Sequence, residues 1–219
     1  MRERHMQFVD MAPIVPEGEK GEAKVVHLNI GKPEAGYTQL RAIVTGGRDA
    51  PISQGTYVQL YVNGAMVMSD TQMERRSNYG VIFRATGDVL IAGLGVGMIL
   101  MPLLANPEVK TVTVIEKSQD AIDLVEEHIR NAAGADGDKL KVICADIFKW
   151  KPPKGQKWDT IYFDIWTDIC TDSLDDMAKL HRKFARRKTS PGAWMDSWKK
   201  AELKLQRDRD RRQEAMWRG

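Results

Sequence analysis

Val89 to Ala105 reads VLIAGLGVGMILMPLLA, and these 17 uncharged residues decide the fold. A membrane span needs roughly 20 apolar residues, so the run is short for one, and its three glycines and Pro102 suit a span poorly. A buried strand, a glycine turn and a buried helix fit it better. The sequence therefore predicts a strand at Val89–Ala92, a turn at Gly93–Gly97 and a helix at Met98–Ala105. A proline belongs in the first turn of a helix, so this helix is expected either to start late or to kink at Pro102.

Strands and helices are predicted to alternate from Gly87 onward. The expected strands are 88–92, 111–115, 140–145, 160–163 and 193–198, and the expected helices after the first are 120–131 and 174–187. Continuous apolar strands separated by helices indicate a parallel sheet covered on both faces. The prediction is an α/β, Rossmann-like, doubly wound and mostly parallel sheet of about five strands, shortened at its C-terminal end. One sheet edge would then need cover from the last helix or from a second subunit.

The residues before this region predict a small β-rich extension. The first 20 residues have no clear period and are expected to form a loose arm. A strand is predicted at 24–30, and a second apolar stretch covers 40–45 and ends at Gly46-Gly47. Residues 56–68 contain Asn63-Gly64 between two β-rich segments, which favours a β-hairpin. Ser69 or Asp70 is expected to cap a following helix. We therefore divide the chain into an N-terminal arm and hairpin unit (1–85), a Rossmann-like domain (86–198) and a charged C-terminal helix (199–219).

Composition and charge narrow the classes of protein. With 42% hydrophobic and 29% charged residues the chain is globular. Two cysteines, Cys144 and Cys170, make no disulfide framework, so a reducing, cytoplasmic setting is expected, and no Cys/His spacing predicts a metal. Residues 179–219 hold 14 Lys and Arg against 5 Asp and Glu, on an otherwise acidic chain whose total is +3. The tail is either a solvated helix or a segment that binds an anionic partner.

Four motifs follow successive strands and predict a nucleoside site. Gly93, Gly95 and Gly97 lie between a strand and a helix, where backbone N–H groups approach a ligand closely. Glu116 ends the next strand, where a carboxylate can accept both ribose hydroxyls. Asp146 ends the third strand and is expected either to accept from an adenine amino group or to cap the turn after it.

The fourth motif is DIWTDIC, Asp164 to Cys170, at the end of the fourth strand. Asp164 and Asp168 are the catalytic candidates, because a carboxylate here can orient or deprotonate an amine nucleophile. Asp164 could also hold the amino group of a cofactor. Trp166 is expected either to stack on adenine or to form a wall of the substrate pocket, to which Tyr79 is also assigned.

These elements resemble class I S-adenosylmethionine-dependent transferases at 93–97, 116 and 146. Within that superfamily GTYVQL…MSDT, VLIAGLGVGM, DIWTDIC and MAKLHRKFARR look most like small spermidine synthase-like proteins of phages and bacteria. The resemblance implies a Rossmann-like fold, S-adenosylmethionine or its decarboxylated form as cofactor, a small-molecule substrate and no metal.

The acidic motif departs from the polyamine pattern of that family. The resemblance implies a D-S-x-D motif followed by a Pro/Gly segment, whereas Asp168 comes one residue late and the segment is missing. No Tyr-His-Glu motif precedes the glycine loop either, and Glu74, Asn78 and Tyr79 are the nearest residues by type. The chain is therefore expected to transfer a methyl group to an unidentified acceptor, for which an amine is one candidate.

Three other functions stay open from the sequence. One is spermidine synthase-like aminopropyl transfer from decarboxylated S-adenosylmethionine. Another is a nucleoside-binding module without catalysis, with a basic tail. The third, a nicotinamide-dependent dehydrogenase, is disfavoured because the third glycine comes early for a GxGxxG loop. A homodimer is also expected, because a second subunit would cover the sheet edge, and no membrane association is expected.

Overall fold

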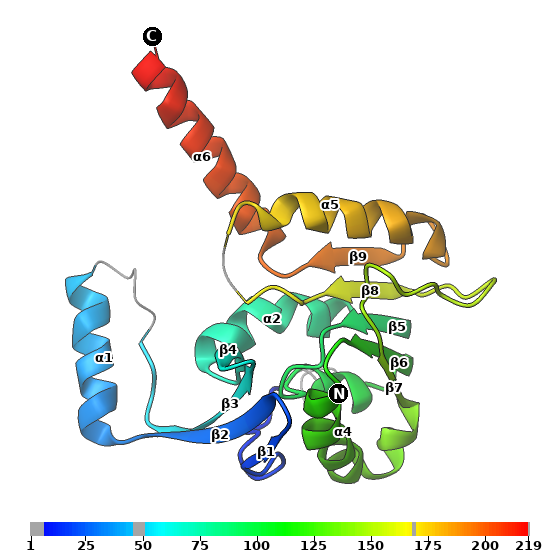
Figure 1. The fold of residues 1–219 in the computed structure, drawn as a ribbon, viewed down its shortest axis with the longest axis horizontal. Coiled ribbons are helices and arrows are strands. Elements are labelled where there is room, and N and C mark those ends of the chain that lie inside the picture. Colours follow the sequence, from blue (N-terminus) through cyan, green and yellow to red (C-terminus); the bar gives the residue numbers. More distant parts are fainter. Residues whose placement is uncertain (1–6, 46–50, 168–169, 219) are drawn as a thin grey trace.

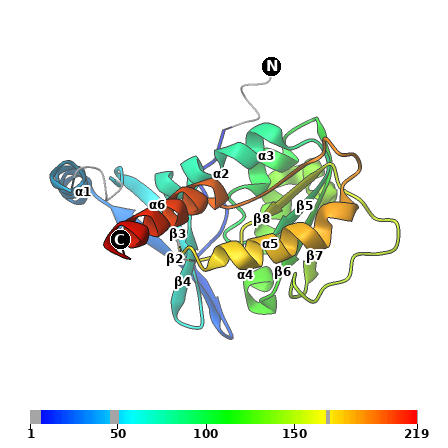
Figure 2. The same cartoon turned by 90° about the horizontal axis from the view of Figure 1, so that it is seen from above.

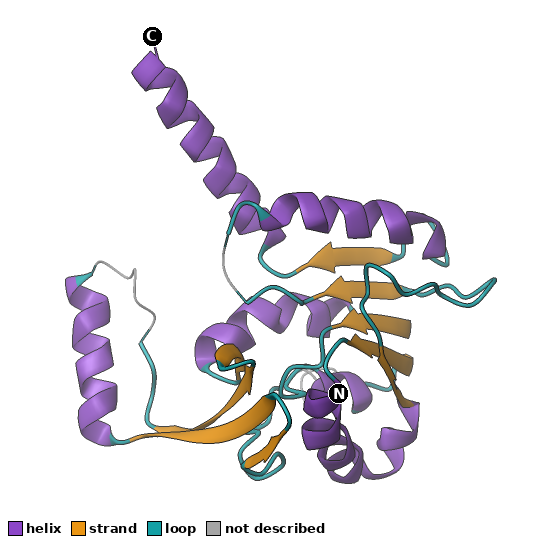
Figure 3. Cartoon of the chain, in the orientation of Figure 1, coloured by secondary structure: helices purple, strands orange, loops and turns teal. Residues whose placement is uncertain are grey.

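A computed structural model describes residues 7–45, 51–167 and 170–218. Its strands form two sheets (Figures 1 and 3). The first has the order β1-β2-β3-β4 and is antiparallel, and the second has the order β7-β6-β5-β8-β9 and is parallel throughout. The strands are β1 Gly18–Lys20, β2 Ala23–Ile30, β3 Gly55–Val62, β4 Ala65–Ser69, β5 Gly87–Ala92, β6 Val109–Glu116, β7 Leu140–Cys144, β8 Thr160–Phe163 and β9 Trp194–Ser197.

The parallel sheet confirms the predicted α/β fold and its five strands. From β5 the chain moves outward to β6 and β7, then returns to the other side of β5 for β8 and β9. The strand order therefore reverses between β5 and β8, and ligands of such sheets bind where the carboxyl ends flank this reversal. Helix α4 (Gln119–Ala133) covers one face through Ile122, Val125 and Ile129, as its period predicts. Helix α5 (Ser173–Phe184) covers the other face through Leu180 and Phe184.

The helix that follows the glycine turn is shorter than predicted. Helix α3 is Leu100–Leu104, and the chain from Gly93 to Ile99 turns before it. Pro102 is the third residue of α3, a place in the first turn where its missing N–H is not needed. The late start of α3 therefore removes the conflict between Pro102 and a helix beginning at Met98.

The antiparallel sheet contains the predicted hairpin. Asn63 and Gly64 have φ of 53° and 75° and connect β3 to β4, as a two-residue turn of this type requires. Helix α2 (Gln72–Arg84) follows, but neither Ser69 nor Asp70 caps it, because its N-cap is Thr71. The Asp70 carboxyl is fully buried and accepts hydrogen bonds from the backbone N–H groups of Met11 and Val58. Asp70 therefore fixes the N-terminal segment to the sheet.

The apolar stretch 40–45 is helical, which corrects the expectation of an all-β unit over 24–68. Helix α1 (Lys32–Val44) carries Pro33 in its first turn, Glu34 nearby and Arg41 in its last turn, all of them helix signals. No residue of α1 is buried. Figures 1 and 2 both place it at the end of the β2–β3 arm, away from the parallel sheet.

The charged C-terminal segment forms helix α6 (Lys200–Arg218). Leu203 packs against α5, but from Lys204 onward the side chains are mostly exposed, and Figure 1 shows the helix running away from the sheet. It does not run along β9, so the expectation that this helix covers the sheet edge is wrong. Within the described part of the chain, no helix has both the length and the hydrophobicity to cross a membrane.

Candidate functional site

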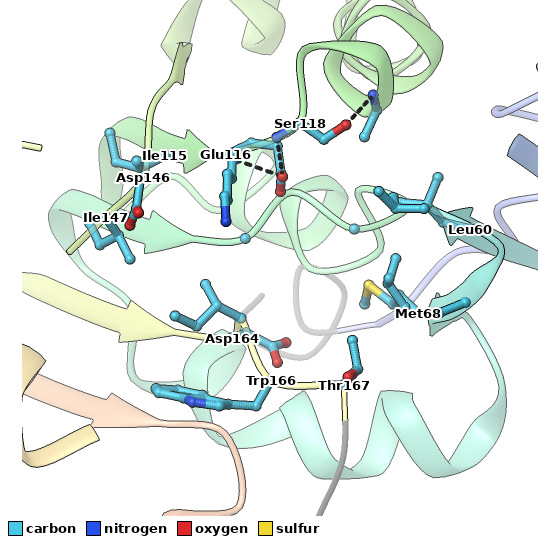
Figure 4. Close-up of a pocket in the computed structure, with 18 of the residues that line it drawn as sticks. Leu60, Met68, Ile115, Glu116, Ser118, Asp146, Ile147, Asp164, Trp166 and Thr167 are labelled. Carbon is cyan, nitrogen blue, oxygen red and sulfur yellow. Dashed lines mark hydrogen bonds between the residues drawn. The ribbon is translucent and has the colours of Figure 1, made fainter. Parts of the chain in front are cut away.

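A cavity of about 850 Å³ lies at the carboxyl ends of the parallel strands. The parallel sheet contributes residues that follow β5, β6, β7 and β8, and the hairpin β3–β4 and helix α2 complete the walls (Figure 4). Such a volume lies at the upper end of the range for ligand sites. The described residues that line the cavity include seven carboxylates and one lysine, Lys117. The net negative charge of the cavity lining therefore favours cationic ligands.

Two of the three predicted glycines line this cavity. Gly93 (φ 100°) and Gly95 (φ 54°) form its floor, whereas Gly97 does not reach it. A methyl group on Gly93 would collide with the backbone oxygen of Asp164, so β5 and β8 can approach only because this position has no side chain. A methyl group on Gly97 would collide with Ile129 of α4 instead. Gly97 therefore serves the packing of α4 beneath the loop.

Glu116 joins the glycine loop to the end of β6. Its Oε2 accepts a hydrogen bond from the Leu94 N–H at 2.9 Å, and its Oε1 accepts from the N–H groups of Lys117 at 2.7 Å and Ser118 at 2.9 Å. A carboxylate has about four acceptor positions, so one on Oε2 is left for a ligand hydroxyl. Glu116 is thus both a structural link and part of the cavity wall.

Asp146 lies on the cavity wall beyond the end of β7, beside Ile115, Ile147 and Phe148. Its Oδ1 accepts a hydrogen bond from the Phe148 N–H at 2.9 Å, so the residue caps the turn that follows, as one of the two interpretations expected. The apolar side chains next to a carboxylate form a surface that suits a flat aromatic base with an amino group. Figure 4 shows this group on the opposite side of the cavity from Leu60 and Met68.

Asp164 faces the cavity at the end of β8, and α2 brings Glu74 to the same place. Burial and, to a smaller extent, the negative charge of Glu74 raise the pKa of the Asp164 carboxyl to about 7, and a hydrogen bond from Asn78 opposes the rise. Burial also raises the pKa of Glu74, against the charge of Lys199 and a hydrogen bond from Ser77. Asp164 can therefore hold or accept a proton near neutral pH.

Tyr79 does not line the cavity, while its neighbour Asn78 is fully buried. The Asn78 amide oxygen accepts a hydrogen bond from the Tyr162 hydroxyl at 2.9 Å. Positions 74 and 78 are one turn apart on the inner face of α2, whereas position 79 points outward and its side chain is 48% exposed. Helical periodicity, applied to residues 72–84, would have favoured Glu74 over Tyr79.

Trp166 lines the cavity and is partly buried against the cluster around Leu174 and Met177. Asp168 lies outside the described residues. Trp198 also lines the cavity, and its Nε1 donates a hydrogen bond to Ser77 Oγ at 2.9 Å. The loop after β9 and the second turn of α2 therefore meet at the acidic end of the site.

The residues present fit an S-adenosyl cofactor in their chemistry. An apolar surface beside Asp146 suits adenine, Glu116 suits a ribose hydroxyl, and the acidic end around Asp164 suits a sulfonium and an ammonium group. Asp146, Glu116 and Asp164 thus match, in turn, the adenine, the ribose and the charged tail of such a molecule. This agreement rests on side chains at the ends of three separate strands of one sheet, β6, β7 and β8.

No protein-family model matches the chain, and no curated protein matches it. Among solved structures, it is similar to the CcbJ methyltransferase from Streptomyces caelestis, with 19% identity and a TM-score of 0.42 over 56% of this chain and 46% of that one. It is also similar to an S-adenosylmethionine-dependent methyltransferase from Clostridium acetobutylicum, with 19% identity and a TM-score of 0.42 over 58% and 50%.

A third similar structure is the glycopeptide N-methyltransferase MtfA complexed with S-adenosyl-L-methionine, with 18% identity and a TM-score of 0.38 over 51% of this chain and 46% of that one. The chain thus spans about half the length of the solved structures it matches. At this level of likeness, what the chain does has to be read from its own residues.

Proposed function

We propose that this chain is a transferase that moves a methyl group from S-adenosylmethionine to the nitrogen of a small-molecule amine. The observation that carries the proposal is a single cavity whose lining brings Gly93, Glu116 and Asp146 together with the carboxyl pair of Asp164 and Glu74. In this proposal the cofactor supplies an electrophilic methyl group whose leaving group is a neutral thioether. Cofactor and acceptor then lie next to each other in one cavity, with Asp164 beside the reacting nitrogen.

The chain's own residues would align the acceptor and take its proton. The apolar surface beside Asp146 would hold adenine, and Glu116 would accept from the ribose. Asp164 would first accept a proton from the bound ammonium, which frees the nitrogen lone pair to attack the methyl carbon, because a carboxyl with a pKa of about 7 accepts a proton near neutral pH. The negative charge of Glu74 would keep the pKa of the Asp164 carboxyl raised and would attract the cationic amine. Holding nitrogen and methyl carbon in line supplies the rest.

Aminopropyl transfer from decarboxylated S-adenosylmethionine is the second candidate, and one observation favours it. Among the described residues, the cavity lining includes one basic residue, Lys117, which follows Glu116 at the ribose end. Lys199 acts on Glu74 but does not line the cavity, so a carboxylate on the cofactor's tail would have no lining cation beside Asp164. In the first proposal that carboxylate would depend on backbone N–H groups of the glycine loop. The tail of the bound cofactor therefore decides between the two candidates.

Calorimetric titration with both cofactors, followed by mass spectrometry of turnover, tests the proposal. We expect heat from S-adenosylmethionine and release of S-adenosylhomocysteine with an amine acceptor. Glu116→Gln should weaken binding about 10-fold or more, because hydrogen bonds to a charged group contribute about 1.5–3 kcal/mol, whereas the exposed Glu127→Gln should not change it. Release of 5′-methylthioadenosine would establish the second candidate. Binding without turnover of any amine would indicate a non-catalytic module, and no heat from either cofactor would overturn all three.

A further inference from the structure

The cavity wall on the far side of Asp164 from the adenine end is hydrocarbon. Its apolar side chains come from the β3–β4 hairpin, Leu60, Val62, Val67 and Met68, while Asn63 and Ala65 at the hairpin turn also line the cavity. Figure 4 places Leu60 and Met68 on this side and Ile115, Asp146 and Ile147 on the other, with Asp164 between the two groups. The cofactor proposed above would fill the adenine end and the centre. The hydrocarbon wall therefore belongs to whatever lies beside the reacting nitrogen.

A β-bulge turns this wall toward the cavity. Leu60 pairs with Met68, but the next residue, Tyr61, pairs with Met66, so Val67 has no partner on β3. In a regular strand successive side chains alternate between faces, yet here both Val67 and Met68 line the cavity. Met66 does not, and its side chain is 49% exposed. The extra residue thus adds apolar surface to the site, which is a recognised use of bulges beside functional sites.

We propose that the acceptor is a monoamine with an apolar body, an alkyl- or arylamine, whose nitrogen lies at Asp164 and Glu74 and whose hydrocarbon part lies on the hairpin wall. This inference rests on the proposed function and goes beyond it, because it assigns the acceptor's chemical class and the residues that select it. The carboxyl pair selects the cationic nitrogen. The wall selects the remainder by removing its apolar surface from water.

A diamine is the competing occupant. Its second ammonium would lie against Val62, Val67 and Met68, where an unpaired charge is costly. Two further carboxylates, Glu22 and Asp120, do line the cavity beyond the hairpin. However, Asp120 Oδ2 already accepts a hydrogen bond from the Glu22 N–H at 3.0 Å. The structure therefore favours the monoamine, and a long diamine that reaches these two acids is the alternative to be tested.

The test measures amine binding to the protein saturated with S-adenosylhomocysteine, by calorimetry. For propylamine, pentylamine and heptylamine we expect affinity to rise about threefold to fourfold with each added methylene, the factor that corresponds to about 0.8 kcal/mol. 1,7-Diaminoheptane should bind at least 10-fold more weakly than heptylamine. Equal affinities along the series, or tighter binding of the diamine, would overturn the inference while leaving the proposed function standing. Failure of S-adenosylhomocysteine to bind would overturn both.

Two methionines on one strand provide a matched pair of variants. Met68→Gln should weaken heptylamine binding about 10-fold. It should also abolish the rise in affinity that the longest alkylamines show with each added methylene. Met66→Gln should change neither quantity. Met68 also packs against Gly95, so Val67→Thr, which keeps the side chain's shape, provides a second variant. It should weaken heptylamine several-fold while the affinity for S-adenosylhomocysteine stays unchanged. Equal effects of the Met66 and Met68 substitutions, with no effect of Val67→Thr, would contradict the inference.

Discussion

The five-stranded parallel sheet and the four-stranded antiparallel sheet each form one side of the same cavity, by different means. In the parallel sheet, functional side chains come from strand ends, where Gly93, Glu116, Asp146 and Asp164 follow four different strands. In the antiparallel sheet, side chains from the middle of the hairpin face the cavity because of a bulge. The parallel sheet therefore depends on close backbone approach, and the antiparallel sheet on its anchoring and its apolar surface.

If close backbone approach is essential to the parallel sheet, Gly93→Ala should have the largest effect. The added methyl group would collide with a backbone oxygen, at a φ of 100° that side chains avoid. We expect a loss of about 5 kcal/mol in the free energy of unfolding, or failure to fold. Gly36→Ala in α1 is the control, because a methyl group there meets nothing within 4 Å. Urea denaturation measures both, and similar values for the two would contradict the comparison.

For the antiparallel sheet, removal of its buried anchor should cost about 3 kcal/mol. Asp70→Ala leaves the N–H groups of Met11 and Val58 without their acceptor and removes one of the two carboxylates that pair with Arg75. Asp10 also pairs with Arg75, at 3.0 Å, but its side chain is 76% exposed. Asp10→Ala should therefore change stability by less than about 0.5 kcal/mol. Thermal and urea unfolding distinguish the two variants, and an equally mild Asp70→Ala would show that the sheet does not need this anchor.

Where the two sheets meet, stability should depend on pH. Asp164 has an ordinary pKa of 3.8 in the unfolded chain and about 7 in the folded protein. The folded state therefore binds more protons between about pH 4 and pH 7, and stability falls as the pH rises through that window. Partial exposure of this carboxyl limits the loss to about 2 kcal/mol. Asp164→Asn should flatten the profile, whereas the exposed Asp138→Asn should not, and a profile that rises across the window would refute the raised pKa.

The smallest expected effect comes from a single hydrogen bond between the two sides. Tyr162 belongs to the parallel sheet, and its hydroxyl donates to Asn78 of α2 at 2.9 Å. Tyr162→Phe should lower the free energy of unfolding by about 1 kcal/mol. Because Asn78 also opposes the raised pKa of Asp164, the pH profile of stability should shift with the substitution. An unchanged profile would mean that Asn78 keeps its orientation without the tyrosine.

The sequence allowed prediction of the parallel sheet more fully than of the antiparallel one. Strands that are buried on both faces are continuous apolar runs, and residues at their carboxyl ends share one edge, so Glu116, Asp146 and Asp164 could be placed together without coordinates. The hairpin turn at Asn63-Gly64 was equally readable.

The remaining parts depended on tertiary contacts that local patterns do not contain. Helix α1 buries nothing, so its apolar residues show no core-facing period, and only Pro33 and Arg41 mark it as helical. Glu74 and Trp198 reach the site from elements distant in sequence. Tyr79 is among the residues nearest by type to the Tyr-His-Glu motif, but the helical period directs its side chain outward. The bulge at Val67 was invisible, because it is defined by the pairing of two strands.

The β2–β3 pairing continues without interruption up to Ile30 and Gly55, which face each other directly. The connection between them, which contains helix α1, therefore leaves β2 and returns at β3 at directly paired positions. Its length and sequence place no constraint on the register of the strands or on the cavity they help to form. Among natural relatives, insertions, deletions and new surface properties should accumulate in this connection. The β3–β4 hairpin should change only together with the acceptor proposed above.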